Sequence, residues 1–484
     1  MTVSHDLDVS AAKATTATEG PNGAVDASQP PALLHRSLTA RPYKVINAEG
    51  IYLTLDDGRR IIDACGGAAV ACIGHGNEEV LTAVVEQMRQ VSYVHSLTYT
   101  TDSAEQLAHI LLDGNPFGLE KAYFVGSGSE AIDAALKLAR QYFFELGMHD
   151  RTHYVSRRQG YHGTTVGAMT VSSNLPRKKP YAPLQLGNVS WVSPAYAYQY
   201  AHRDETEEQF ATRLVEELDA HIQAIGPEKV IAFIAEPLVG ATSGCTPAPK
   251  GYFAGVRRVC DKYGVLLILD EVMCGMGRTG TMFAFEQEGI VPDIMTMGKG
   301  LGGGYSAIAG VLVHKKVIDA LRHGTSSFNH GHTYQAHPVA CASTLAVQRI
   351  MRREKLVENC AQMGKVLYSL LRQELGGRKY VGDIRGRGLF WALEFVQNKE
   401  TRASFDAAVG FGVRFQTMVF DLGIAVYPGA GTVDGTKGDH AIISPPYNVT
   451  EEQLRTIVDG LKAAYLELER EIDEPGNVGG TLAK

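Results

Sequence analysis

Cysteine, tryptophan and long apolar runs are all scarce in this chain of 484 residues, which has 7 cysteines and 2 tryptophans. No apolar run approaches the roughly 18–20 residues that a membrane-spanning helix needs, which argues against a transmembrane protein. The cysteines form no CxxC pair, so structural zinc sites and thioredoxin-like chemistry have no support. We expect free, buried thiols in a reducing compartment.

A large excess of charge of one sign is also lacking, because 46 Lys and Arg face 53 Asp and Glu, for a net charge of -7. Without a basic field, the chain is not expected to bind nucleic acid or an anionic membrane. His330 and His332 have no further ligands at metal-binding spacing, so no metal is expected. The cation pairs at residues 157–158 and 178–179 are interpreted as solvated surface.

The N-terminal segment has neither the apolar core of a secretory signal nor the arginines of a mitochondrial transit peptide, since no arginine precedes Arg36. A cytoplasmic location is therefore expected. Residues 1–32 contain no aromatic side chain and are rich in Ala, Thr, Ser, Gly and Pro. Residues 473–484 are similar, and both segments are predicted to be disordered tails because they have little apolar surface to bury.

Between these tails, short apolar runs alternate with helical periodicity, which predicts an α/β layer with a mostly parallel sheet. Helices are expected over 131–140 and 252–260, and a long helical stretch from about residue 343 to about 375, followed by short strands near 388–395. Thr450 with Gln453 has capping-box spacing and predicts a final helix. The expected buried strands are Ala122–Val125, His153–Ser156, Val230–Ala235, Val265–Leu269, Ile294–Met297 and Ala309–Val313.

A phosphate site is predicted at Gly126–Ala131, which reads Gly-Ser-Gly-Ser-Glu-Ala between an expected strand and an expected helix. Glycine lets the backbone approach an anion, and a helix N-terminus offers unpaired N–H groups and partial positive charge. Ser127 and Ser129 add hydroxyl donors. The identity of the phosphate stays open, since the pattern also fits a dinucleotide fingerprint or a purely structural turn.

An acid and a lysine follow two other expected strands. Asp270 ends the apolar run Val265–Leu269, where ligands bind in open α/β sheets, and it could hold a protonated ring nitrogen or only cap the next segment. Lys299 lies among glycines after Ile294–Met297. A Walker P-loop fails here, because no Ser or Thr follows the lysine and residue 293 is Asp. A lysine on a flexible surface loop is the alternative.

Together, the three features predict pyridoxal 5′-phosphate chemistry. The Lys299 amine would form a Schiff base with the cofactor aldehyde, Asp270 would keep the pyridinium nitrogen protonated, and the helix N-terminus would hold the phosphate. Such a lysine must lose its proton readily, which burial favours.

The residues that carry this chemistry also resemble a known family, the class-III (ω-) aminotransferases of the fold-type-I pyridoxal-phosphate enzymes, over roughly residues 40–470. The likeness lies in Leu269-Asp270-Glu271-Val272 with Gly275, Gly277-Arg278-Thr279-Gly280, Pro292-Asp293-Ile294, Gly298-Lys299-Gly300-Leu301, Ser127–Ala131, Tyr161-His162-Gly163, Glu236-Pro237, His332-Thr333 and Pro445-Pro446.

The resemblance implies an α/β architecture with two parts. A large domain with a mostly parallel, seven-stranded sheet is expected over 88–345. A smaller α+β domain is expected from both chain ends, 33–87 and 346–472. The family also implies a homodimer with shared active sites.

The resemblance further implies roles for single residues. Lys299 would carry the cofactor and shuttle the proton, and Asp270 would pair with the ring nitrogen. Val272 and Tyr161 would cover the two ring faces, and Thr333 would reach a phosphate across the dimer interface. The remaining cofactor-binding residues are expected to be Ser127, Gly128, Ser129, His162 and Glu236, the last as support for the Asp270 region.

Departures from the family pattern concern the substrate. Many relatives carry an arginine shortly before Pro445-Pro446 to bind a carboxylate, and this chain has none there. Arg387, Arg414 or His440 could replace it. Ala241 stands where the ornithine and γ-aminobutyrate branches have a glutamate, and residues 68–70 are Ala-Ala-Val where amine-specific relatives have a tryptophan. We therefore expect an amine or ω-amino acid donor, a roomy pocket, and pyruvate or 2-oxoglutarate as acceptor.

Three alternatives remain open. A racemase, decarboxylase or phospho-lyase of the same fold would use the same lysine and acid. An NADP-dependent oxidoreductase would bind through Gly126–Ala131, with Arg157 and Arg158 on the 2′-phosphate, but would leave Lys299 unexplained. A non-catalytic homologue would have lost Lys299 or Asp270, and both are present.

Overall fold

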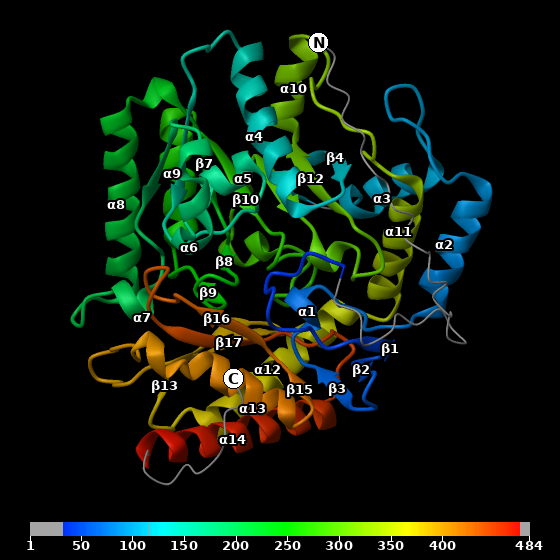
Figure 1. The fold of residues 1–484 in the computed structure, drawn as a ribbon. Coiled ribbons are helices and arrows are strands. Elements are labelled where there is room, and N and C mark those ends of the chain that lie inside the picture. The colour runs from blue at the N-terminus through cyan, green and yellow to red at the C-terminus, as the bar shows by residue number, and fades with distance from the viewer. Residues whose placement is uncertain (1–31, 115, 475–484) are drawn as a thin grey trace, which may run out of the picture. The chain divides into compact units, whose positions relative to one another are not determined.

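The structure is a computed structural model that describes residues 32–114 and 116–474. The chain divides into two units, Met1–Lys44 and Val45–Lys484. In the first unit, residues 32–44 form neither helix nor strand. The second unit holds the elements shown in Figure 1. The predicted tails lie outside the described residues, apart from Ala32, Asp473 and Glu474.

A seven-stranded sheet forms the centre of the second unit, in the order β4-β12-β11-β10-β7-β5-β6. Only β12 runs antiparallel to its neighbours in this sheet, so the predicted, mostly parallel sheet is confirmed. Its strands are β4 (Leu119–Val125), β5 (His153–Arg157), β6 (Val189–Val192), β7 (Val230–Ala235), β10 (Leu266–Asp270), β11 (Ile294–Met297) and β12 (Ala309–His314).

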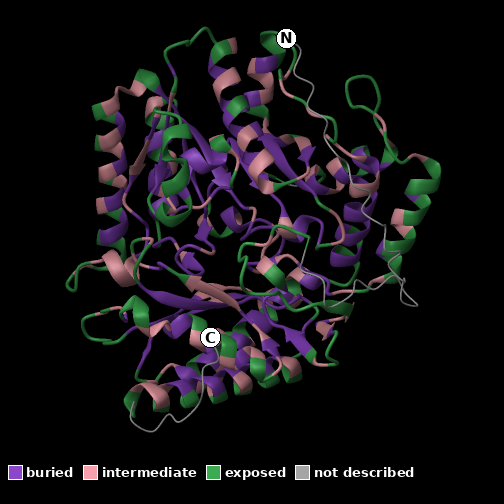
Figure 2. Cartoon of the chain, viewed as in Figure 1, coloured by how far each residue is buried: buried purple, intermediate pink, exposed green. Residues whose placement is uncertain are grey.

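Helices cover both faces of this sheet, which explains why its central strands are apolar throughout. Leu266 and Ile268 of β10 pack in the cluster that includes α4, while Leu267 and Leu269 pack in the cluster that includes α8 and α9. Figure 2 shows the sheet buried and the helices exposed on their outer sides. The helices around the sheet are α2 (Glu78–Gln90), α3 (Asp102–Leu112), α4 (Gly128–Glu145), α5 (Val166–Val171), α6 (Leu175–Lys178), α7 (Ala197–Tyr200), α8 (Glu207–Ile225), α9 (Tyr252–Tyr263), α10 (Lys315–His323) and α11 (Pro338–Arg353).

The rest of the second unit is α+β and is built from both chain ends, as predicted. Strand β3 pairs in parallel with β15, so a segment near residue 62 lies beside one near residue 424. The two four-stranded sheets have the orders β1-β2-β3-β15 and β13-β14-β17-β16. Their elements are β1 (Val45–Glu49), β2 (Tyr52–Leu55), β3 (Arg60–Asp63), α12 (Leu356–Leu375), β13 (Val381–Arg387), β14 (Phe390–Phe395), α13 (Phe411–Asp421), β15 (Ile424–Ala425), β16 (Tyr427–Ala430), β17 (Asp439–Ile443) and α14 (Glu451–Asp473). Three short elements complete the fold: α1 (Gly66–Ala69), β8 (Leu238–Val239) and β9 (Thr246–Pro247).

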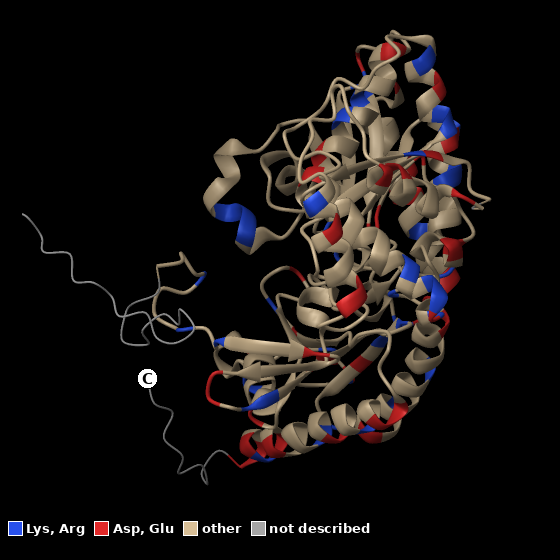
Figure 3. Cartoon of the chain, turned by 90° about the vertical axis from the view of Figure 1, so that its right-hand side faces the viewer, with Lys and Arg blue, Asp and Glu red and all other residues tan. Residues whose placement is uncertain are grey.

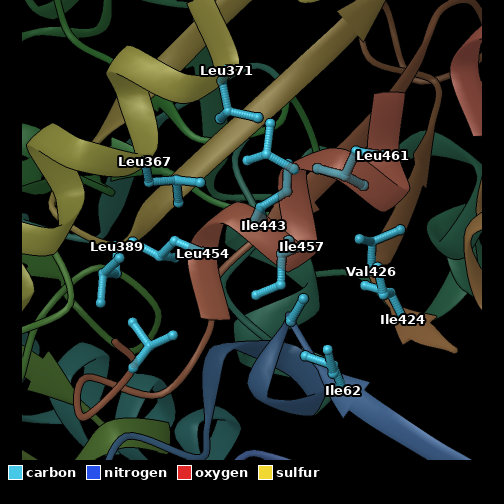
Figure 4. Packing of buried hydrophobic residues seen from close by; sticks show 14 of the residues in the cluster. Ile62, Leu367, Leu371, Leu389, Ile424, Val426, Ile443, Leu454, Ile457 and Leu461 are labelled. Carbon is cyan, nitrogen blue, oxygen red and sulfur yellow. The ribbon is translucent and has the colours of Figure 1, made fainter. Parts of the chain in front are cut away.

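Helix α14 packs the apolar residues of one side against the core of this α+β part. Ile457 and Leu461 of α14 lie with Leu367 of α12 and Ile62 of β3 in one buried cluster (Figure 4). The predicted capping box is confirmed, since the Thr450 hydroxyl accepts from the Gln453 amide and the Gln453 side chain accepts from the Thr450 amide. Both charge signs occur along the outer side of α14 (Figure 3).

Two sequence expectations are corrected. The helical stretch expected from residue 343 to 375 is two helices, because Lys355 adopts a left-handed φ of 51° between α11 and α12. The cation pairs are not uniformly solvated, because Arg157 and Lys178 are buried while Arg158 and Lys179 are exposed. Arg157 donates to the carbonyl oxygen of Glu236, and Lys178 donates to two carbonyls near the end of α5.

All seven cysteines are free and buried, as expected from the sequence. Burial raises the pKa of each thiol, for example that of Cys260 to about 12. No helix within residues 32–114 or 116–474 is long and apolar enough to cross a membrane. The same ranges contain no group of three or more His, Cys, Asp or Glu side chains placed to hold a metal ion. The predicted domain boundaries at residues 87 and 345 stay predictions.

Candidate active site

The candidate residues lie just beyond the carboxyl ends of the large sheet's parallel strands. Ser127–Ser129 follow β4, Tyr161 and His162 follow β5, Glu236 follows β7, Asp270 ends β10 and Lys299 follows β11. These strand ends share one edge of the sheet, so residues up to about 170 positions apart can meet there.

The turn into α4 has the backbone features of an anion-binding site. The Ser127 hydroxyl caps the helix by accepting from the Glu130 amide at 3.3 Å, and the Glu130 carboxylate accepts from the Gly126 amide at 2.7 Å. The first-turn amides of a helix have no intrahelical partner and point outward with partial positive charge. This turn can therefore hold a phosphate between Gly128 and Ser129.

Close packing around Val272 joins the phosphate turn to the lysine segment. A Cβ on Gly128 would lie 2.9 Å from Cγ1 of Val272, and a Cβ on Gly298 would lie 3.3 Å from the same atom. A side chain at Gly128 would therefore clash with Val272, and one at Gly298 would press on both Val272 and Ala309. The glycine before Lys299 thus lies in close contact with Val272 and Ala309.

Asp270 is buried at the end of β10 and held by three donors. Its Oδ2 accepts from Nδ1 of His162 at 2.7 Å, and its Oδ1 accepts from the Val272 amide at 3.0 Å and the Thr296 hydroxyl at 3.2 Å. A carboxylate offers about four acceptor sites. One site is therefore left for a further donor such as a protonated ring nitrogen.

Glu236 ties two loops together beside Asp270. Its Oε1 accepts from the Tyr161 amide at 3.1 Å, and its Oε2 accepts from the Gly240 amide at 2.9 Å. Burial raises the pKa of Glu236, the nearby His162 opposes that rise, and the negative charge of Asp270 adds to it. Glu236 therefore fixes the backbone that presents Tyr161.

Lys299 begins a short 3₁₀ turn and has a left-handed φ of 46°. Such a conformation costs a side-chain-bearing residue about 1–2 kcal/mol and is common at functional sites. The surrounding protein lowers the pKa of Lys299 by desolvation, while Asp270, Glu236 and Cys274 oppose that shift. Within residues 32–114 and 116–474, the ammonium forms no hydrogen bond or ion pair. Its amine is thus predisposed to lose a proton and react.

Some contacts in this cluster go beyond the sequence prediction. His162 is predicted to bind the cofactor, and in the structure its Nδ1 also lies 2.7 Å from Oδ2 of Asp270. Thr296 contributes because it lies opposite Asp270 in the register of β10 and β11, which no motif reveals. Ser127 with Glu130 has capping-box spacing, and the Ser127 hydroxyl accepts from the Glu130 amide, but the Glu130 carboxylate binds the amide of Gly126 and not that of Ser127.

Thr333 is the one predicted site residue that lies apart from this cluster in the part of the chain that the structure describes. It is exposed in the segment between α10 and α11, and its carbonyl accepts from the Tyr93 hydroxyl at 3.0 Å.

None of the three residues suggested in place of a substrate-binding arginine offers a free positive charge: two are in ion pairs and one is a buried, neutral histidine. Arg387 pairs with Glu288 at 2.6 Å, and Arg414 pairs with Glu471 at 2.5 Å. His440 is buried, and desolvation with the nearby Arg385 charge lowers its pKa to about 3, which keeps it neutral.

The two small-residue positions noted in the sequence lie near each other. Ala69 belongs to a buried cluster against which Ala241 packs, together with Tyr427 of β16. Of the two positions, Ala241 also lines a cavity beside Tyr161, so the expected roomy pocket stays a prediction.

The sequence is similar to one protein family over most of its length. A family model described as Aminotransferase class-III matches residues 35–465. An uncharacterized aminotransferase of Schizosaccharomyces pombe is 47% identical over 429 residues, which is 89% of this chain and 94% of that protein. The putrescine–pyruvate aminotransferase of Pseudomonas aeruginosa is 33% identical, covering 89% of this chain and 92% of that protein.

Solved structures show the same likeness. The ω-transaminase of Pseudomonas jessenii in complex with PMP superposes with a TM-score of 0.84 at 33% identity, covering 90% of this chain and 94% of that one.

Proposed function

The chain belongs to the class-III aminotransferase family, and from this membership we propose that it transfers the amino group of an amine or ω-amino acid to a 2-oxo acid, with pyridoxal 5′-phosphate on Lys299. The predicted family, fold class and aminotransferase activity are confirmed. The family depends on pyridoxal phosphate. The observation that carries the proposal is the Lys299 amine, which has a lowered pKa and no hydrogen-bond partner among the described residues, beside the buried carboxylate of Asp270.

The residues present fit this cofactor. The phosphate suits the α4 turn at Ser127–Ser129, and the ring nitrogen suits the remaining acceptor site of Asp270. Val272 and Tyr161 supply an aliphatic and an aromatic surface for the two faces of a planar ring. The Glu130 carboxylate at this turn already accepts from the Gly126 amide.

The cofactor, when bound, supplies the electron sink that makes the bonds at the substrate's reacting carbon labile. Lys299 would move a proton between that carbon and C4′ of the cofactor, a role that its lowered pKa suits. Asp270 would hold the ring nitrogen in its protonated form, and His162 would orient Asp270 through its Nδ1–H. Glu236 would keep Tyr161 in place through the backbone.

The donor is proposed to be a primary amine or ω-amino acid other than ornithine, because Ala241 stands where the ornithine and γ-aminobutyrate branches have a glutamate. Ala241 is also a small residue in the wall of the cavity beside Tyr161. The Pseudomonas aeruginosa relative is named for putrescine and pyruvate. That name supports a terminal amine as donor and pyruvate, or a similar 2-oxo acid, as acceptor.

We also propose a homodimer in the cytoplasm whose active sites are completed by Thr333 of the second copy. Large apolar side chains are exposed at Leu97 (92%), Tyr334 (63%) and Leu184 (60%), which a monomer would leave in water. Thr333 lies next to one of them. A mixture of Lys299→Ala and Thr333→Ala chains would regain activity if subunits exchange and sites are shared, because one site of each mixed dimer would have both residues intact.

A spectroscopic and product assay tests the proposed reaction. The purified protein is loaded with pyridoxal phosphate, and its visible absorption is followed as 1-phenylethylamine, β-alanine, alanine or ornithine is added. We expect the visible band to fall with the first two, with release of the matching carbonyl compound, and to return with pyruvate or 2-oxoglutarate. Borohydride followed by peptide mass spectrometry should find the cofactor on Lys299. Ornithine as the best donor would refute the donor proposal. A band that no amine moves would favour racemisation, decarboxylation or phosphate elimination.

A further inference from the structure

A side cavity of about 370 Å³ adjoins the candidate active site at Tyr161. It lies between three parts of the second unit: the segment after β5, the loop after β8 and the β16–β17 hairpin. Its lining residues are Gln159, Tyr161, Asn174, Pro176, Arg177, Ala241, Thr242, Tyr427–Gly431, Gly435 and Thr436. Lys299 does not line it, so the cavity would receive the part of a substrate that is remote from the reacting amino group.

The cavity has one charged lining residue in the described chain, Arg177. Its guanidinium lies over the Tyr161 ring, 5.3 Å from the centroid. No hydrogen bond or ion pair engages that guanidinium among residues 32–114 and 116–474. Arg177 therefore keeps its donors available, unlike Arg387 and Arg414.

A buried neighbour holds the turn that carries Arg177. Lys178 donates from Nζ to the carbonyls of Thr170 at 3.1 Å and Ser172 at 2.6 Å, and it lies over the Trp191 ring. These contacts fasten α6 to the end of α5. They leave the preceding residue, Arg177, directed to the cavity side.

The opposite wall is also fixed. The Gln159 side chain donates to the carbonyls of Gly431 at 2.9 Å and Thr432 at 3.0 Å, which ties the β16–β17 hairpin to the segment after β5. A Cβ on Gly435 would lie 3.7 Å from Pro176, so the hairpin packs next to α6. Hydrogen bonds therefore hold both walls of the cavity in place, and Arg177 lies in its lining.

We propose that Arg177 binds the substrate carboxylate in this cavity and so replaces the arginine that the chain lacks before Pro445-Pro446. A guanidinium presents paired N–H donors that match the two oxygens of a carboxylate. The other lining residues are uncharged, so they neither neutralise Arg177 nor repel an anion. This inference rests on the proposed function. The carboxylate belongs either to the 2-oxo acid acceptor or to an ω-amino acid donor.

The test compares Arg177→Gln and Arg177→Lys with a matched control, Lys179→Gln, which removes an exposed cation two residues away that does not line the cavity. The kcat/KM is measured for pyruvate, for β-alanine and for 1-phenylethylamine, which has no carboxylate. Losing a charge-assisted hydrogen-bonded pair should reduce binding about 10- to 100-fold. We expect that loss in Arg177→Gln as a raised KM for pyruvate or β-alanine, with a much smaller change for 1-phenylethylamine, an intermediate value in Arg177→Lys, and no change in Lys179→Gln.

The pattern across substrates identifies the source of the carboxylate, since a raised KM for pyruvate alone indicates the acceptor and one for β-alanine alone the donor. Equal losses for all three substrates, or none, would overturn the inference. Calorimetric binding of propionate to the loaded protein gives a readout that needs no turnover. If the unmodified protein transfers no amino group, the proposed function fails, and weaker propionate binding in Arg177→Gln still decides the role of Arg177. Equal propionate affinity in both proteins would count against it.

Discussion

Replacing Asp270 by asparagine would remove one negative charge from the candidate active site and leave its shape almost unchanged. Oδ1 could still accept from the Val272 amide and the Thr296 hydroxyl. The new NH₂ group would face Nδ1 of His162, where Oδ2 now accepts at 2.7 Å. His162 can adapt by moving its proton to Nε2, which lies 3.4 Å from the Ser156 hydroxyl. Folding should therefore survive the substitution.

The cost should fall on the cofactor and the reaction. A hydrogen bond to a charged partner contributes about 1.5–3 kcal/mol, so the dissociation constant of pyridoxal phosphate should rise about 10- to 150-fold. The half-reaction with 1-phenylethylamine should slow by at least a similar factor, because the ring nitrogen is no longer kept protonated. Removing the Asp270 charge should also lower the pKa of Glu236, since that charge now raises it.

Equilibrium titration of the cofactor and stopped-flow absorbance in a single half-reaction give both quantities. The control is Asp133→Asn, which alters a carboxylate that accepts from the Ala168 amide away from the Asp270 cluster. Thermal unfolding of the cofactor-free proteins checks that both variants fold. An Asp270→Asn protein with affinity and rate within a few-fold of the unmodified chain would refute the assignment of Asp270 to the ring nitrogen.

Three further predictions concern proton binding and stability. Burial lowers the pKa of Lys299, so keeping the side chain charged in the folded protein destabilises it below that pKa, and this cost fades as the pH rises toward 10.5, the ordinary pKa of lysine. The cofactor-free chain should therefore gain stability with rising pH relative to Lys299→Met. Urea midpoints of the two proteins that change in parallel with pH would contradict this. Leu461→Ala leaves a cavity in the buried cluster under α14 and should lower the free energy of unfolding in urea by about 2–5 kcal/mol. Val413→Ala, at an exposed position, should change it little, and equal losses in the two variants would contradict the packing described. Arg385→Met leaves the buried Glu394 carboxylate without its ion-pair partner and should lower the free energy of unfolding by about 3–5 kcal/mol. The double variant Arg385→Met/Glu394→Gln should recover much of that stability, and no recovery would show that lost packing and not the uncompensated charge causes the loss.

The sequence could predict the sheet and most of the site because both are encoded in contiguous segments. Strands such as Val230–Ala235 are apolar throughout, since helices cover both of their faces. Asp270 ends such a strand and Lys299 comes two residues after another, so their positions at the sheet edge follow from the order of the local segments.

Other features depend on contacts that no local pattern carries. Strand β6 is only partly buried, which weakens its apolar signal, and an apolar run such as β12 does not reveal its direction in the sheet. The burial of Arg157 depends on a carbonyl 79 residues away. The position of Arg177 over Tyr161 depends on how Lys178 anchors a short turn, which spacing in the sequence does not encode.

The pairing of β3 with β15 has a consequence for how the chain is made. More than 350 residues separate Ile62 from its partner Ile424. At a synthesis rate of about 5–20 residues per second, β3 leaves the ribosome roughly 20–70 s before β15 exists. During that time its outer edge is unpaired, and such edges attract other chains. Yield from cells should therefore respond to chaperone supply and growth temperature more than the stability of the finished protein would suggest.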